Sequence, residues 1–312
     1  MSPVKTDITI LGAGPAGLTA AIYACRAGRK VVLVERSVPG GQQTLTDKIE
    51  NYPGTGPDGT SGAELSRQME SQAKALGATI LADRVKSICF SERSQTVTLS
   101  YLESIESNAL IIASGRDAKL LCINGEDDYR GRGVSYCAIC DGPFFRDKEV
   151  AVIGGGNSAL EEALFLTKTA KSVTLIHRRQ AFRADKQVVD HVMHHPKIKF
   201  IPDHSPISVS GEGIMRSLTI EHVSTKVQQV LPMSAMFVYI GHHPNTSFLS
   251  DQLILDGSGY VMTDDHMRTS WKGVFAAGDV RQKSLYQIVT ATADGAIAAI
   301  SADAYLDERE GQ

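Results

Sequence analysis

The sequence predicts an α/β protein that contains two units of parallel β-sheet. The order apolar strand, glycine-rich turn, helix and second apolar strand occurs near residue 10 and returns near residue 150. A chain of 312 residues is long enough for two domains with separate hydrophobic cores. Its hydrophobic fraction of 42% and charged fraction of 21% are ordinary for a globular protein.

Charge and hydropathy argue against two classes of partner. The net charge of −3 gives no electrostatic reason to expect binding to nucleic acid or to an anionic membrane. No apolar run approaches the roughly twenty residues of a membrane helix, and the first residues lack the pattern of a signal peptide. We therefore expect a cytoplasmic protein without a nucleic-acid or membrane partner.

The first unit begins with a predicted strand at residues 8–11 that ends at Gly12-Ala13-Gly14-Pro15-Ala16-Gly17. A helical pattern follows at 18–27, and a second strand at 31–34 ends at Glu35. This is the order of a Rossmann dinucleotide-binding unit, in which the glycines allow a tight turn, close approach to a pyrophosphate and close helix–strand packing. A carboxylate at Glu35 suits a ribose with free hydroxyls, as in FAD. A glycine-rich turn without a ligand is the alternative, which the two flanking strands disfavour.

The second unit has the same order with a different ending. A predicted strand at 150–153 leads into Gly154-Gly155-Gly156-Asn157-Ser158-Ala159, and a helix at 160–169 precedes a strand at 173–176. The next residues are His177-Arg178-Arg179, with Arg183 shortly after and no acid. Clustered guanidinium groups pair with a 2′-phosphate through charge-assisted bonds, so this site suits NADPH. A solvated basic helix start is the alternative.

A pair of closely spaced cysteines lies just before the second glycine-rich turn. Cys137 and Cys140 can close a small disulfide and so store two electrons. A zinc site would need two further ligands, but Cys25, Cys89 and Cys122 are scattered singly. The carboxyl group of Asp141 could deliver and remove protons during thiol exchange.

A second candidate metal cluster is rich in histidine. His191 and His195 are four residues apart and would share a helix face, with His204 as a third ligand. No carboxylate or cysteine completes the set, and Pro196 ends the helix. A solvated surface helix is the favoured interpretation, and we expect no metal.

Several motifs in register resemble the low-molecular-weight, bacterial-type thioredoxin reductases over nearly the whole chain. The motifs that follow the family order are Gly12 to Gly17, Gly40-Gly41-Gln42, Glu50-Asn51-Tyr52-Pro53-Gly54, Cys137 to Gly142, Gly154 to Ala159, His177 to Arg183 and Gly278-Asp279. The resemblance implies two Rossmann-like nucleotide-binding domains of three-layer ββα type, the second inserted in the first. The FAD-binding domain would comprise residues 1–116 and 245–312, and the NADPH-binding domain residues 117–244.

The resemblance also implies a homodimer that passes electrons from NADPH through FAD and the Cys137–Cys140 disulfide to a thioredoxin-like protein. Cys140 would be the flavin-side sulfur, Cys137 would attack the disulfide of the partner, and Asp141 would be the acid–base residue. The expected FAD ligands are Gly12, Gly14, Ala16, Gly17, Glu35, Arg36, Gly41, Gln42, Asn51, Gly115, Gly278, Asp279, Tyr286 and Gln287. The expected NADPH ligands are Gly154, Gly156, Asn157, Ser158, Ala159, His177, Arg178, Arg179 and Arg183.

One position departs from the family pattern. Tyr286 stands where the family often has an arginine, before the expected Gln287. Its ring would either stack on the isoalloxazine or pack in the dimer interface.

Three other functions fit parts of the sequence. A small-molecule dithiol oxidase and a ferredoxin-dependent reductase of the same fold have little use for a 2′-phosphate cluster, which this chain has. A flavin-bound, redox-responsive binding protein would not need the dithiol, Asp141 and a complete second nucleotide site together.

Overall fold

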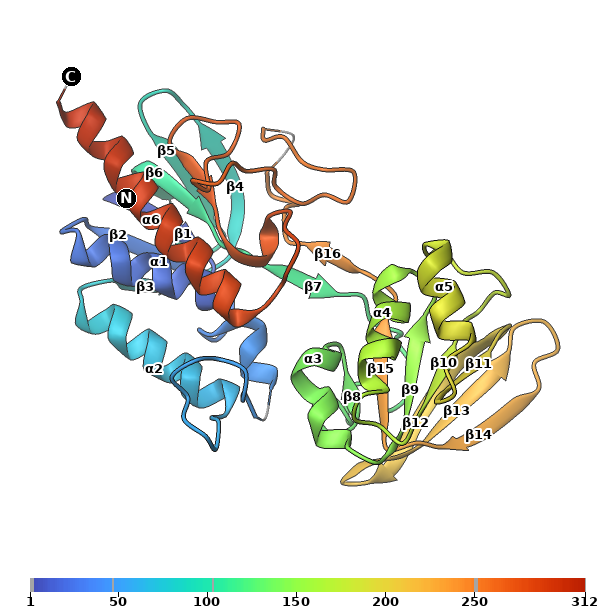
Figure 1. Ribbon diagram of the computed structural model, residues 1–312. Coiled ribbons are helices and arrows are strands. Elements are labelled where there is room, and N and C mark those ends of the chain that lie inside the picture. The colour runs from blue at the N-terminus through green and yellow to red at the C-terminus, as the bar shows by residue number, and fades with distance from the viewer. Residues whose placement is uncertain (1–2, 47, 103, 250–251, 312) are drawn as a thin grey trace. The chain divides into compact units, whose positions relative to one another are not determined.

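The computed structural model describes residues 3–46, 48–102, 104–249 and 252–311. The chain forms two compact units, Met1–Asp117 with His243–Gln312, and Ala118–His242 (Figure 1). Strands β7 (Arg116–Ala118) and β16 (His242–Pro244), in which the chain passes between the units, pair with each other. No helix in the described ranges is long and apolar enough to cross a membrane.

The sheet of the first unit has the order β3-β2-β1-β6-β5-β4, and β17 also pairs with β6. Strands β1, β2, β3, β6 and β17 run parallel, whereas β4 and β5 are antiparallel. The strands are β1 (Val4–Leu11), β2 (Val31–Glu35), β3 (Thr79–Ala82), β4 (Val85–Phe90), β5 (Gln95–Leu99), β6 (Ser104–Ile112) and β17 (Val274–Ala276).

Helices cover one face of this sheet (Figure 1). They are α1 (Pro15–Arg26), α2 (Gly62–Ala75) and α6 (Ile288–Glu310), and the short helices η1 (Gly41–Leu45) and η3 (Gly278–Val280) lie in the loops. Side chains alternate along a strand, so Ile8 and Ile10 of β1 pack toward the helices. Leu11 packs into a second core on the other face with residues of β4 and β5. The parallel strands thus lie between two layers.

The second unit is also a three-layer structure. Its parallel sheet has the order β11-β10-β9-β15-β8, and an antiparallel sheet has the order β12-β13-β14. Val150 and Val152 of β9 pack against the helices, whereas Ala151 and Ile153 pack against the antiparallel sheet. The elements are β8 (Val134–Ser135), α3 (Ala138–Asp141), η2 (Gly142–Phe145), β9 (Glu149–Gly154), α4 (Asn157–Leu166), β10 (Ser172–Ile176), α5 (Lys186–Met193), β11 (Ile198–Ile201), β12 (His204–Glu212), β13 (Ile214–His222), β14 (Gln228–Pro232) and β15 (Ala235–Tyr239).

The predicted strand–turn–helix–strand orders are confirmed, with two differences in helix ends. Helices α1 and α4 begin three residues earlier than predicted, because the end of each glycine-rich pattern already forms the first helical turn. Helix α5 ends at Met193, so His195 lies beyond it and the predicted shared helix face with His191 is wrong. Among the described residues, no group of three His, Cys, Asp or Glu side chains could hold a metal ion.

Candidate functional site

The N-terminus of α1 is built for close approach of a ligand backbone. A Cβ at Gly17 would lie 1.8 Å from the carbonyl oxygen of Gly12, so only glycine allows this packing of turn and helix. Gly14 is the N-cap of α1 and provides no side-chain cap, and a Cβ added there would meet nothing within 4 Å. Uncapped N–H groups beside open space fit a pyrophosphate. Gly41 borders the same space, because a Cβ added to Gly41 would lie 3.2 Å from the Cα of Gly14.

Glu35 lies at the end of β2, next to this turn. Its Oε2 accepts a hydrogen bond from the Ala13 N–H at 2.8 Å, and its Oε1 accepts one from the Ser37 N–H at 2.9 Å. Each carboxylate oxygen keeps a second lone pair, so the group can still accept bonds from ribose hydroxyls. The guanidinium of the neighbouring Arg36 pairs with the Asp117 carboxylate at 3.0 Å.

Three of the expected small residues have different surroundings. Ala16 is buried and packs under Gly278, since a Cβ at Gly278 would lie 2.7 Å from that of Ala16. Gly115 has a φ of +68° and open space around it. Ala16 and Gly278 therefore pack closely against each other, whereas Gly115 leaves room for a ligand.

Asp279 lies in a cluster of charged side chains on the same unit. Burial raises the pKa of its carboxyl group, against the opposing charges of Lys283 and Arg116. Its Oδ1 is buried without a hydrogen-bond partner among the described residues, although Lys283 Nζ lies 3.5 Å away. Lys283 and Arg281 also pair with Asp294 at 3.1 Å. A buried acceptor without a hydrogen bond fits a ligand hydroxyl, such as one on a ribityl chain.

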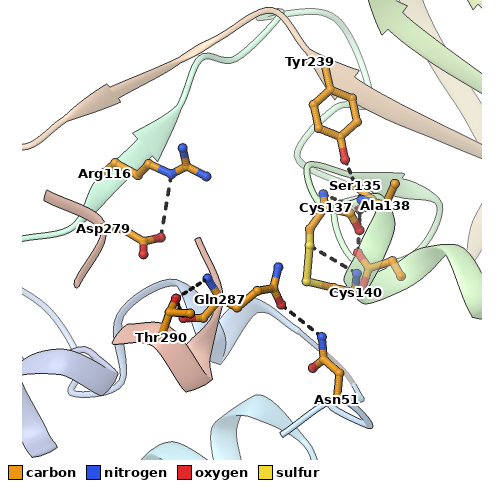
Figure 2. The surroundings of a disulfide bond; sticks show 11 residues. Asn51, Arg116, Ser135, Cys137, Ala138, Cys140, Tyr239, Asp279, Gln287 and Thr290 are labelled. Atoms are coloured by element: carbon orange, nitrogen blue, oxygen red, sulfur yellow. Dashed lines mark hydrogen bonds and ion pairs between the residues drawn. A yellow bond between two sulfur atoms is a disulfide. The ribbon is translucent and has the colours of Figure 1, made fainter. Parts of the chain in front are cut away.

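Gln287 and Asn51 approach each other from distant parts of the chain. Nδ2 of Asn51 donates to Oε1 of Gln287 at 3.0 Å (Figure 2). Gln287 is also the N-cap of α6, where it forms a capping box with Thr290. The helix start thus fixes the position of Gln287, and the amide pair connects it to the loop of Asn51.

Tyr286 and Gln42 both contact Arg116. The Arg116 guanidinium lies 3.6 Å from the centre of the Tyr286 ring. Nε2 of Gln42 donates a hydrogen bond to the Arg116 carbonyl oxygen. The structure thereby brings these two expected flavin residues together through a residue that the sequence did not single out.

The second glycine-rich turn, at the start of α4, has a similar form. Its N-cap Gly156 has no side-chain cap, and a Cβ added there would have only the Arg183 carbonyl oxygen within 4 Å, at 3.9 Å. Gly154 packs against the Cβ of buried Ala159. Asn157 forms two hydrogen bonds with Asp185, at 2.8 and 3.0 Å, and Ser158 is exposed. This turn also fits a pyrophosphate at a helix N-terminus.

The basic cluster lies directly beside this turn. The His177 ring lies against Gly155, and the Arg183 N–H donates to the Gly155 carbonyl at 2.7 Å. Arg178 and Arg179 are exposed, as is Arg183. Burial and the charges of Arg178 and Arg179 lower the pKa of His177, and its Nε2 is buried without a hydrogen-bond partner among the described residues. Three exposed guanidinium groups near the turn fit a phosphate monoester.

The cysteine pair forms a disulfide in the same unit. Cys137 and Cys140 are joined with their Cα atoms 5.3 Å apart, and both are half-buried. Ser135 Oγ accepts a bond from the Cys137 N–H at 3.1 Å and donates to Oδ2 of Asp141 at 2.6 Å. The Tyr239 hydroxyl accepts a bond from the Ala138 N–H at 2.6 Å (Figure 2).

Ser135 and Tyr239 were missed by the sequence analysis. They come from β8 and β15, which are neighbours in the parallel sheet. Ser135 precedes Cys137 by only two residues, but nothing in its sequence context distinguishes a structural hydroxyl from a functional one. Tyr239 is about a hundred residues away, so no local pattern could have assigned it to the surroundings of the disulfide.

The chain has close similarity to known proteins over nearly its full length. A profile of the pyridine nucleotide-disulphide oxidoreductase family matches residues 6–295. A thioredoxin reductase of Peptoclostridium litorale is 42% identical over 308 residues, which cover 97% of each chain. One of Rickettsia felis is 42% identical over 309 residues, covering 98% of this chain and 99% of the relative.

Solved structures of thioredoxin reductases also match the chain over nearly its full length. The crystal structure of a thioredoxin reductase from Streptococcus pyogenes matches with a TM-score of 0.94 at 42% identity, covering 98% of this chain and 100% of the other. A thioredoxin reductase from Giardia duodenalis matches with a TM-score of 0.92 at 38% identity, covering 97% and 99%.

Proposed function

This chain belongs to the pyridine nucleotide-disulphide oxidoreductase family and within it to the thioredoxin reductases, and we propose that it uses the Cys137–Cys140 disulfide to reduce a thioredoxin-like protein. The observation that carries this proposal is the disulfide itself, which lies in the same unit as a basic, uncapped nucleotide turn. The family uses FAD and NADPH.

The proposed FAD site lies in the unit that contains both chain ends. The uncapped N-terminus of α1 would hold the pyrophosphate, Glu35 the adenosine ribose, and Oδ1 of Asp279, which has no hydrogen-bond partner among the described residues, a ribityl hydroxyl. Asn51 and Gln287, joined by the hydrogen bond between their side-chain amides, would contact the ring system. When bound, FAD accepts a hydride from NADPH and supplies two electrons to a disulfide.

The proposed NADPH site is at the start of α4. Its pyrophosphate would lie on the N–H groups of that helix, and the guanidinium groups of Arg178, Arg179 and Arg183 would bind the 2′-phosphate. Positive charge there, with no carboxylate at the end of β10, favours NADPH over NADH.

The thiol chemistry balances in three steps. Two electrons and two protons convert the Cys137–Cys140 disulfide to two thiols. The Cys137 thiolate then attacks the partner disulfide, which forms a mixed disulfide and releases one partner thiolate. The Cys140 thiolate attacks the sulfur of Cys137, which re-forms the internal disulfide and releases the second partner thiolate. Asp141, held by Ser135, would exchange the protons.

The wider assignments follow from the family. We propose a thioredoxin as the substrate, a homodimer as the assembly and the cytoplasm as the location. A reducing compartment is the one in which an enzyme that generates protein thiols operates. The boundaries between the FAD-binding and NADPH-binding domains, at residues 116/117 and 244/245, stay a prediction.

The exposed arginines argue against the rival functions. An oxidase that takes electrons from a small dithiol, or a reductase fed by ferredoxin, has no 2′-phosphate to bind. A binding protein without turnover would not need a reducible disulfide in the same unit as a nucleotide turn.

A turnover assay tests the proposal. Purified protein with NADPH, thioredoxin and a chromogenic disulfide should generate thiols, and both Cys137→Ser and Cys140→Ser should abolish this activity. Cys89→Ser, which changes an exposed free thiol, is the matched control and should keep it. Oxygen consumption driven by a small dithiol, without NADPH-dependent thiol production, would favour the oxidase instead.

A further inference from the structure

Arg116 contacts three segments that contribute to the proposed flavin site. Its guanidinium carbon lies 3.6 Å from the centre of the Tyr286 ring, and its Nε lies 3.7 Å from Oδ2 of Asp279. Its carbonyl oxygen accepts a bond from Gln42. The Arg116 side chain is only 17% exposed, so solvent screens these contacts weakly.

The shape of the guanidinium group explains how the Arg116 side chain contacts both Tyr286 and Asp279. A planar guanidinium can stack on an aromatic face while its N–H edge pairs with a carboxylate. One face of Tyr286 is therefore covered by Arg116, and this face is not free to stack on an isoalloxazine. Tyr260 approaches the same ring, with its ring centre 5.7 Å away, and the ring is thus held on more than one side.

Asp279 needs the cations around it. Burying a carboxylate is unfavourable unless opposite charge compensates it. Lys283 lies 3.5 Å from Asp279 but is shared with Asp294 at 3.1 Å. Arg116 is the second cation that the structure places beside Asp279, and its loss would leave the carboxylate paired, among the described residues, with the shared lysine alone.

We propose that Arg116 is a positioning residue of the flavin site, which orients the Asp279 carboxylate and the Tyr286 ring and adds positive charge there. The inference rests on the proposed function, because it takes Asp279 as a ligand of the flavin. It assigns the cation of this site to strand β7 rather than to position 286.

Two properties of the flavin test this role. In Arg116→Ala, apoprotein should bind FAD about tenfold more weakly, as expected for the loss of one partly buried charge contact. The midpoint potential of the bound flavin should become more negative, because removal of a cation disfavours the added electrons. Arg116→Lys should restore the potential but not the affinity, since an ammonium group keeps the charge without the planar stacking.

A double variant tests whether the positive charge matters or only its position in the sequence. Arg116→Ala combined with Tyr286→Arg removes the guanidinium at position 116 and supplies one from position 286, next to the place of the first. This variant should recover the midpoint potential of the flavin. Arg84→Ala, which removes an exposed arginine of the same unit, is the control and should match the wild type. Circular dichroism of each apoprotein verifies that the variants fold.

The outcomes separate the two proposals. If wild-type protein binds FAD while Arg116→Ala equals it in affinity and potential, the role of Arg116 is overturned and the proposed function stands. If the potential falls in Arg116→Ala and neither Arg116→Lys nor the double variant restores it, packing rather than charge is responsible and the inference is again overturned. Wild-type protein that binds no FAD would overturn the proposed function and this inference with it.

Discussion

Replacement of Glu162 by glutamine should stabilise the protein at pH 8 and leave its stability at pH 4 unchanged. Glu162 lies on α4, and its Oε2 is buried without a hydrogen-bond partner among the described residues. Burial, helped by the charge of Glu161, raises the pKa of Glu162 from 4.5 to about 7. Complete burial would make a pKa difference of this size worth about 3 kcal/mol. Because the side chain is partly exposed, screening reduces the effect to about 1–2 kcal/mol.

The direction in which stability changes with pH follows from proton binding. Between pH 4.5 and 7 the folded state holds a proton that the unfolded state has lost, so stability falls as the pH rises through this window. Above pH 7 the full cost of the buried charge is present, and glutamine removes it. Thermal unfolding of nucleotide-free protein should show a Tm gain of about 3–8 °C for a unit of this size at pH 8. Glu161→Gln, at the exposed neighbouring position, should change the Tm much less, and an equal gain at pH 4 and pH 8 for Glu162→Gln would refute the reasoning.

Three further substitutions test the sites. Tyr239→Phe leaves the Ala138 N–H without its acceptor, at a cost of about 1–3 kcal/mol. NADPH-driven reduction of the disulfide, measured by stopped flow, should slow while the flavin content is kept. An unchanged rate would count against a role of Tyr239 in holding the segment that contains the disulfide. Arg179→Ala should raise the KM for NADPH about tenfold or more, as for the loss of one charge-assisted bond, and leave that for NADH unchanged; equal changes for both nucleotides would contradict 2′-phosphate binding. Gly17→Ala puts a Cβ 1.8 Å from the Gly12 carbonyl oxygen and should yield protein with a reduced flavin-to-protein ratio by absorbance; a full ratio would show that the turn tolerates the methyl group.

Local patterns predicted the nucleotide units well. The strands before and after Gly12 and Gly154 lie where the alternation of apolar runs and glycines placed them. The helix starts were predicted late, because residues such as Pro15 were treated as part of the turn although they form the first helical turn. His195 was assigned to a helix that in the structure ends at Met193. The helix therefore ends before the position at which Pro196 alone would end it.

Contacts between distant segments could not be predicted in the same way. The hydrogen bond from the Ala138 N–H at the start of α3 to the Tyr239 hydroxyl at the end of β15 joins segments about a hundred residues apart. The contact between Arg116 and the Tyr286 ring joins residues 170 positions apart, and nothing in the sequence alone indicates that these two residues meet. Such contacts depend on the folded sheet, whereas glycine turns depend on a few adjacent residues.

The central claim is that electrons from NADPH reach the Cys137–Cys140 disulfide. The most direct measurement is an anaerobic titration with NADPH, and separately with NADH, that follows the flavin absorbance and then alkylates free thiols for mass spectrometry. Cys25, Cys89 and Cys122, which are free thiols, serve as internal references. We predict bleaching at far lower NADPH than NADH, with two new thiols, at Cys137 and Cys140, in wild type and none gained in Cys140→Ser. Bleaching by neither nucleotide, or bleaching without new thiols at these two positions, would contradict this electron path.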